Sequence, residues 1–91
     1  MTEPIVPASK LDLSAANDLA TQLRQRDKGD IVVDMSQVTH LGALCMQTLI
    51  SASGSLATKS RKLTLENVSE RVEEQMRVMG MTPELLTKGP Q

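Results

Sequence analysis

The sequence predicts a small α/β domain in which about four strands form a mixed or parallel sheet and the helices pack mainly on one face. Residues 31–33 are apolar and β-branched, which suits a strand inside a sheet. Residues 15–23 and 42–60 instead repeat apolar side chains at helical spacing. Because strand-like and helix-like segments alternate along the chain, a layered α/β arrangement follows.

The N-terminal third is expected to form two short extended segments and a helix. Residues 5–6 and 11–13 are the extended segments, and Pro7 confines the first of them to a sheet edge. Ser14 has a side chain preferred at a helix N-cap, and the apolar residues around and after it mark one helical face. That face consists of Ala15, Ala16, Leu19, Ala20 and Leu23.

The middle third predicts a strand, a turn and a long helix. The side chains of Asp34 and Ser36 are spaced to bond nearby backbone groups, so we expect a turn directly after the strand. From Gly42 to about Ser60 the apolar period becomes about 3.6 residues, which predicts a helix lying against the sheet. Its inward stripe is Cys45, Leu49, Ala52 and Leu56, with Met46, Ile50 and Ala57 beside it.

The last third predicts a second main strand and a third helix. A helix separates residues 62–65 from the strand at 31–33, so these two strands are expected to pair in parallel. Asn67 and Glu70 have the spacing of a capping box, and Gly80 suits the position just past a helix. The apolar face of this helix is Val68, Val72, Met76 and Met79.

Two further patterns lie near the C-terminus. Glu73 and Arg77 are four residues apart on the third helix, which predicts an ion pair. Residues 82–84 suit the start of a short final helix, because Pro83 is favoured at a first helical position. This helix would contain Leu85 and Leu86.

The composition fits one compact domain. The chain has 91 residues, 40% of them hydrophobic, and we expect residues 1–87 to form one domain and residues 88–91 a disordered tail. A net charge of -1 and the absence of Phe, Tyr and Trp argue against binding to nucleic acid or to a membrane surface. A single cysteine, no signal-peptide pattern and no long apolar run predict a cytoplasmic protein.

Two segments carry a family resemblance. Val33-Asp34-Met35-Ser36 and Val38-Thr39-His40-Leu41, followed by a helix start with small residues, resemble the STAS domain of anti-sigma-factor antagonists over most of the chain. The resemblance implies the STAS fold. Many members have a further strand and helix at the C-terminus, so the last sheet edge is expected to be open here and available for a homodimer.

In that family the loop usually reads Asp-Ser-Ser/Thr/Ala-Gly-Leu, and a partner kinase phosphorylates the Ser after the Asp. The alignment places Gly42 at the Asp, Ala43 at the phosphoacceptor and Cys45 at the Gly. Ala43 has no oxygen to phosphorylate, so the loop is expected to bind its partner constitutively. The candidate partner-binding residues are Thr39, His40, Leu41, Gly42, Ala43, Leu44 and Gln47, although Leu41 and Leu44 fit core positions equally well.

Other reactive side chains have simpler explanations. His40 and Cys45 are the only residues of their kinds, but no third orienting residue stands at a recognisable spacing and one His with one Cys cannot form a closed metal site. We therefore expect no catalytic residue, no metal and no cofactor. Ser36 and Thr39 are candidates for a displaced phosphorylation, but turn formation and strand-end capping explain both.

The helix start Gly42-Ala43-Leu44-Cys45 looks most like small STAS proteins associated with bacterial chemotaxis clusters. This resemblance implies a non-enzymatic interaction module that binds a chemotaxis histidine kinase. Alternatives in the same family are an anti-sigma-factor antagonist that binds a serine kinase and the STAS subunit of a lipid-transport ATPase complex. The alternative from another class is a small thiol enzyme that uses Cys45.

Overall fold

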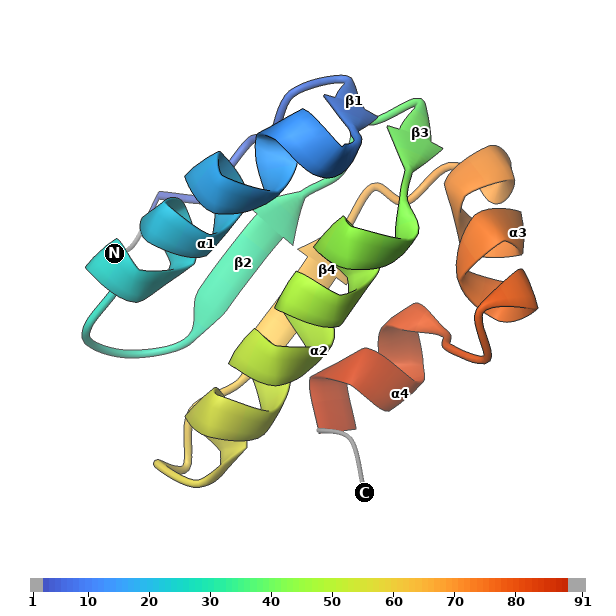
Figure 1. Ribbon diagram of the computed structural model, residues 1–91. Helices are drawn as coiled ribbons and strands as arrows, with labels where there is room; N and C mark the ends of the chain where they lie inside the picture. Colours follow the sequence, from blue (N-terminus) through green and yellow to red (C-terminus); the bar gives the residue numbers. More distant parts are fainter. Residues whose placement is uncertain (1–2, 89–91) are drawn as a thin grey trace.

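The computed structural model describes residues 3–88 and confirms the expected α/β class (Figure 1). Strands and helices alternate along the chain, and all strand pairs are parallel. The elements are β1 (Lys10–Leu11), the 3-10 helix η1 (Leu13–Ala15), α1 (Ala16–Gln25), β2 (Ile31–Asp34), β3 (His40–Leu41), α2 (Ala43–Ala57), β4 (Leu63–Glu66), α3 (Glu70–Val78) and α4 (Pro83–Lys88).

The four strands form two parallel pairs. β2 pairs with β4, with Ile31 opposite Leu63, and β1 pairs with β3. The extended segment expected at residues 5–6 is reduced to one bridge, in which the Ile5 amide donates to the Val32 carbonyl at 2.9 Å and the Asp34 amide to the Ile5 carbonyl at 2.7 Å. β2 therefore lies between Ile5 and β4, as expected for a central strand.

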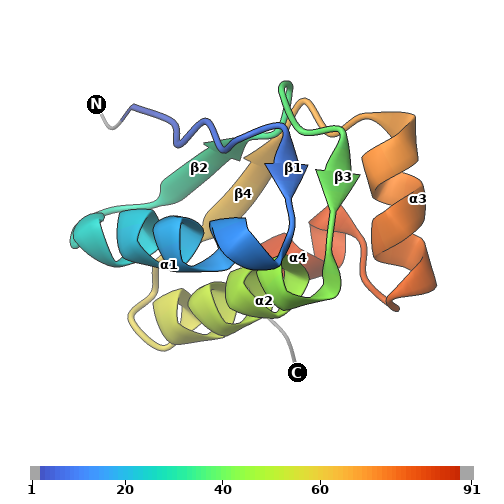
Figure 2. The same cartoon turned by 45° about the horizontal axis from the view of Figure 1, so that its top comes forward.

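Helices α1, α2 and α4 cover one face of the β2–β4 pair, whereas α3 lies beside β3 at one end of the molecule (Figure 2). The two strands alternate in burial: Ile31, Val33, Leu63 and Leu65 face the helices and are buried. Val32, in contrast, is only partly buried. The apolar run at 31–33 thus packs on one face only, because the helices form a single layer.

The start of α1 differs from the prediction. The N-cap of α1 itself is Ala15, not Ser14. Asp12 caps a preceding 3-10 turn, η1, since its Oδ1 accepts from the Ser14 amide at 3.1 Å and from the Ser14 hydroxyl at 2.7 Å. A carboxylate is a stronger acceptor than a hydroxyl, so the chain turns two residues earlier and forms η1. As a result, Leu13 lies in the 3-10 helix rather than in an extended segment.

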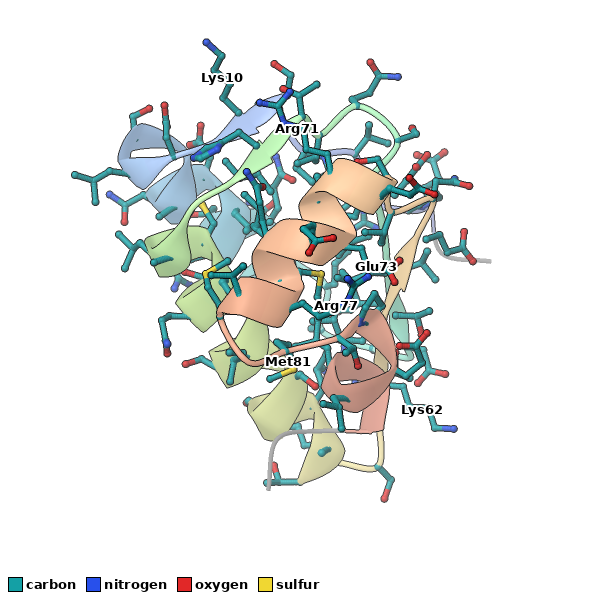
Figure 3. All side chains as sticks on the ribbon, turned by 90° about the vertical axis from the view of Figure 1, so that its right-hand side faces the viewer. Lys10, Lys62, Arg71, Glu73, Arg77 and Met81 are labelled. Carbon is teal, nitrogen blue, oxygen red and sulfur yellow. The ribbon has the colours of Figure 1, made fainter. Side chains whose placement is uncertain are left out.

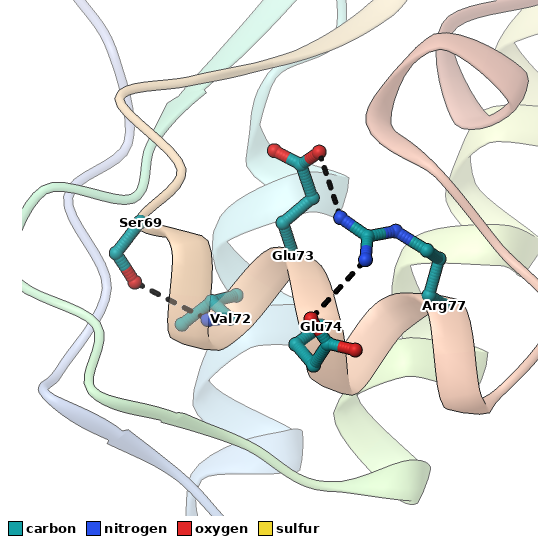
Figure 4. A network of polar contacts seen from close by, with 5 residues as sticks. All are labelled: Ser69, Val72, Glu73, Glu74 and Arg77. Atoms are coloured by element: carbon teal, nitrogen blue, oxygen red, sulfur yellow. Dashed lines mark hydrogen bonds and ion pairs between the residues drawn. The ribbon is translucent and has the colours of Figure 1, made fainter.

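The predicted capping box of α3 is also wrong. Ser69 is the N-cap, and its hydroxyl accepts from the Val72 amide at 3.2 Å (Figure 4). Asn67 has a φ of 57° and donates instead to Asp34 Oδ1 at 3.1 Å, which joins the ends of β4 and β2. Asn67 and Ser69 are both suitable capping residues. Because Asn67 is bonded to Asp34 at the end of β2, Ser69 caps the helix.

The rest of α3 follows the prediction. Glu73 and Arg77 form the expected ion pair at 3.3 Å (Figures 3 and 4), and Glu74 also pairs with Arg77 at 3.1 Å (Figure 4). Val72 and Met76 are buried on the predicted face. Gly80 has a φ of +79° directly after the C-cap, the left-handed conformation that ends helices.

α4 packs against α2 and β4. The Thr82 hydroxyl accepts from the Leu85 amide at 3.1 Å, and Leu86 is buried. Ser53, a polar residue absent from the predicted stripe of α2, is buried and donates to the Leu86 carbonyl. This bond satisfies both polar groups where the two helices meet.

The C-terminal helix is longer than predicted. α4 extends to Lys88, which was assigned to the tail, while the remaining tail residues 89–91 and residues 1–2 lie outside the described residues. Within residues 3–88, β4 pairs with no strand other than β2. Self-association through this open edge stays a prediction.

Candidate functional site

The turn at residues 34–36 forms as predicted. Asp34 Oδ1 accepts from the Ser36 amide at 2.9 Å and from the Asn67 side chain. These hydrogen bonds, the Ser36 amide first, hold the pKa of the Asp34 carboxyl below its ordinary value. The Asp34 side chain of this turn therefore helps to end β2.

β3 is held on one side by β1 and on the other by a side chain. The Thr39 amide donates to the Ser9 carbonyl at 2.7 Å, and the Thr39 hydroxyl donates to the same oxygen at 3.2 Å. On the other side, Gln75 Oε1 accepts from the Leu41 amide at 2.8 Å and Gln75 Nε2 lies 3.3 Å from His40 Nδ1. Because Oε1 is the acceptor, the amide nitrogen faces His40 as a donor.

Gln75 was missed by sequence reasoning. It lies on α3 and reaches β3 across 34 residues of sequence. The available signal was a polar residue beside the apolar positions Val72 and Met76, on the side of α3 that turns toward the domain. Long-range side-chain contacts of this kind have no local sequence pattern.

Gly42 caps α2 without a side chain. Its amide donates to the Leu11 carbonyl at 2.8 Å, and a Cβ added to Gly42 would lie 3.0 Å from that same oxygen. The close approach of the β1 backbone thus favours glycine at position 42 over a residue with a side chain.

The predicted partner-binding residues divide into exposed and buried ones. Leu41 is only 2% exposed and packs in the core, so its side chain cannot contact a partner and that prediction is corrected. Leu44 is 46% exposed, which favours the contact interpretation over the core one. Gly42 is half-buried, and the exposed members are Thr39, His40, Ala43, Leu44 and Gln47.

Leu13 adds to this group and was not predicted. It is 77% exposed in η1, which packs against α2. The preceding residue, Asp12, accepts a 3.4 Å hydrogen bond at its carbonyl from Cys45 Sγ, so η1 lies beside the first turn of α2. We call the exposed residues Leu13, Thr39, His40, Ala43, Leu44 and Gln47 the α2 N-terminal surface.

The structure does not pair His40 with Cys45 as a catalytic couple. Cys45 is fully buried, and burial raises the pKa of its thiol, with a further increase from the negative charge of Asp12. A raised pKa leaves little thiolate, which is the nucleophilic form. His40 Nδ1 instead contacts Gln75.

Residues 3–88 contain neither a cluster of metal-ligating side chains nor a helix that could span a membrane. No three His, Cys, Asp or Glu side chains of residues 3–88 are grouped so that they could hold a metal ion. The helices in that range are also too short or too polar to cross a membrane.

A groove continues from the α2 N-terminal surface between α1 and α2. Its volume is about 600 Å³, and Leu44 and Gln47 line it at the start of α2. Lys59 and Arg24 line it as well, beyond the last residue of α2 and near the end of α1. The exposed surface at the start of α2 is therefore one part of a longer feature.

Comparison with known proteins identifies a family. The family model described as "Mlab, STAS domain" matches residues 7–87, which includes every residue of the α2 N-terminal surface. Neither a curated protein sequence nor a solved structure matches the chain.

Proposed function

The chain belongs to the STAS domain family, and we propose that it is a non-enzymatic interaction module whose α2 N-terminal surface binds a signalling kinase constitutively. Domains of this family are generally binding modules, which supports an interaction role over catalysis. The burial of Cys45, which raises the pKa of its thiol, argues in the same direction, against the thiol enzyme.

The observation that carries the proposal is the exposed apolar surface at the start of α2. Ala43 is exposed at the position aligned with the phosphoacceptor, and Leu44 and Leu13 are exposed near it. Covering exposed apolar side chains with a partner removes them from water, which lowers the free energy and favours binding. Because Ala43 has no hydroxyl, a kinase cannot place a charge there to expel the partner.

The proposed partner is a chemotaxis histidine kinase. This choice rests on the resemblance of the Gly42-Ala43-Leu44-Cys45 segment to small STAS proteins of chemotaxis clusters. An anti-sigma serine kinase fits less well, since its usual cycle needs the missing serine. The lipid-transport ATPase subunit is the remaining alternative, and the same experiment distinguishes all three.

A displaced phosphorylation is not part of the proposal. The Thr39 hydroxyl already donates to the Ser9 carbonyl, and Asp34 holds the Ser36 amide in the turn. We expect no phosphate on the chain after incubation with the kinase and ATP, as measured by intact mass. A phosphorylated Ser36 or Thr39 would replace constitutive binding with a regulated form.

The test is recovery of the partner from the native cytoplasm by the tagged wild-type chain. Ala43→Glu should abolish recovery, because a carboxylate would be buried without a partner in the interface. Glutamate is favourable in the first turn of a helix, so this variant should fold. Ala57→Glu places the same charge on an exposed residue at the other end of α2 and should retain binding.

The identity of the recovered protein decides among the alternatives. A histidine kinase supports the proposal, whereas an anti-sigma kinase or an ATPase subunit assigns the module to another system. If the wild-type chain recovers none of these, or if Ala43→Glu binds like wild type, the proposed surface is wrong.

A further inference from the structure

The groove between α1 and α2 is long, open and continuous with the α2 N-terminal surface. α1 and α2 lie side by side and run in the same direction (Figure 1). The 15 residues of α2 extend over about 22 Å. Leu44 and Gln47 belong to both the surface and the groove, so a partner seated on the one would also reach the other.

The groove is lined like a binding surface for a macromolecule, and not like a closed pocket for a small ligand. The side chains of Leu23, Ile31 and Leu56 are buried beneath it. The α2 wall presents short side chains, among them Ser51 and Ser55, so the backbone of another helix could approach closely. The mixture of apolar and hydroxyl groups is typical of the surface that one helix presents to another.

Charge is distributed unevenly around the groove. Four cationic residues line it and only one acidic residue, Asp27, although the whole chain has a net charge of -1. Two of the cations are already used, because Arg26 donates to the Glu3 carbonyl and Arg61 donates to the Gly29 and Arg26 carbonyls. The positive charge here is therefore a local feature and not a consequence of composition.

The other two cations are available. Arg24 and Lys59 are exposed and form no ion pair or side-chain hydrogen bond with any residue in 3–88, where Arg77 makes the salt bridges. Arg24 lies in the last turn of α1, and Lys59 follows the end of α2. Leu44 and Gln47, at the start of α2, are uncharged, so the groove has an uncharged end and a cationic end.

We propose that this groove binds an amphipathic helix of the partner, with apolar side chains against the Leu44 end and acidic side chains beside Arg24 and Lys59. The inference rests on the proposed function, because it extends the same interface. The positive charge of the groove favours an acidic helix. Because the groove continues from the α2 N-terminal surface, this helix is expected to belong to the partner bound there. A small anion would need only the cationic end and is the competing occupant.

The first experiment measures binding of the purified chemotaxis histidine kinase to full-length variants. The double variant R24E/K59E should bind at least about tenfold more weakly, mainly through a lower association rate, and the difference should shrink in high salt. The double variant K28E/K62E is the matched control, since it changes the net charge by the same amount and both lysines are exposed but do not line the groove. Retained affinity in R24E/K59E, with Ala43→Glu still inactive, would overturn the groove and leave the proposed function intact.

A steric variant tests whether a helix occupies the groove, independently of the charge of the groove. Ser51→Trp fills the exposed middle of the groove without changing charge and should also lower the affinity. Circular dichroism confirms that each variant folds. Unchanged binding by Ser51→Trp would mean that no helix lies in the groove.

The second experiment does not depend on the kinase. A synthetic helical peptide with a leucine stripe and glutamates near one end should shift the backbone NMR signals of Ser51, Ser55 and Lys59, and the same peptide with lysines should not. Inorganic phosphate serves as the small-anion probe. No shifts with the glutamate peptide, or shifts with phosphate alone, would overturn the helix proposal even if the kinase binds elsewhere.

Discussion

Two turns of this domain each follow a parallel strand, but one uses its polar side chain inside the domain and the other exposes apolar side chains. The turn at residues 34–36 follows β2, and the turn at residues 42–43 follows β3. The first keeps an aspartate and a serine, and the aspartate is used internally: Asp34 Oδ1 accepts from the Ser36 amide and from Asn67. The second has neither group and instead exposes Ala43 and Leu44 to solvent.

The difference indicates that the first turn stabilises the fold, whereas the second is the better candidate for partner binding. At the 34–36 turn, the Asp34 carboxylate accepts hydrogen bonds from within the domain, so it stabilises the end of β2. At the 42–43 turn, a Cβ on residue 42 would lie 3.0 Å from the Leu11 carbonyl oxygen, which favours glycine there, and the side chain of Leu44 stays exposed. A phosphate-controlled loop would need the reverse arrangement, with an acceptor hydroxyl exposed at the start of α2.

The largest stability effect should come from restoring the family's aspartate. Gly42→Asp should lower the free energy of unfolding by about 1–3 kcal/mol, because the new Cβ would lie 3.0 Å from the Leu11 carbonyl oxygen. Aspartate at a helix N-cap ordinarily stabilises, so the sign of the change is informative. Denaturant unfolding measures it.

The neighbouring substitution is the control. Ala43→Ser restores the hydroxyl at an exposed position and should change stability by less than about 0.5 kcal/mol. A stabilised Gly42→Asp variant would mean that packing against β1 does not explain the glycine.

A somewhat smaller effect is expected at the support of β3. Gln75→Ala removes the acceptor of the Leu41 amide and the contact to His40, and should cost about 1–2 kcal/mol. Hydrogen exchange of the Leu41 amide should accelerate in this variant. Glu74→Ala, which loses only an exposed ion pair, should leave both quantities nearly unchanged.

The smallest effect concerns acid stability at the 34–36 turn. The lowered pKa of Asp34 means that the folded state favours the carboxylate, so its contribution is present above the ordinary value of 3.8 and is lost as the pH falls below that value. Asp34→Asn should therefore reduce the difference in Tm between pH 7 and pH 3. An unchanged difference would show that the turn does not need the charge.

The main elements could be predicted because their signals are local. β2, β4 and α2 follow from the β-branched run and from the two periodicities, and the end of α3 follows from Gly80. Helix starts were harder, since Asp12 competes with Ser14 and Ser69 with Asn67 within two residues. Asp12 is used because its carboxylate is the stronger acceptor, and Ser69 is used because Asn67 is bonded to Asp34 at the end of β2.

The candidate site was predictable only in part, for a similar reason. Position along the chain located the α2 N-terminal surface, but not whether Leu41 or Leu44 faces solvent, because both lie at the change from strand to helix. Leu13 and Gln75 come from elements distant in sequence, and only the pairing of β1 with β3 and the contact of α3 with β3 bring them there. Such contacts depend on tertiary structure.

Constitutive binding at the 42–43 turn is the central claim, and one titration tests it most directly. The affinity of the wild-type chain for the purified histidine kinase is measured by calorimetry before and after incubation with ATP, alongside Ala43→Glu and Ala57→Glu. We expect the wild-type affinity to be the same before and after ATP, Ala57→Glu to match it, and Ala43→Glu to show no binding. Weaker wild-type binding after ATP, or undiminished binding by Ala43→Glu, would contradict the account.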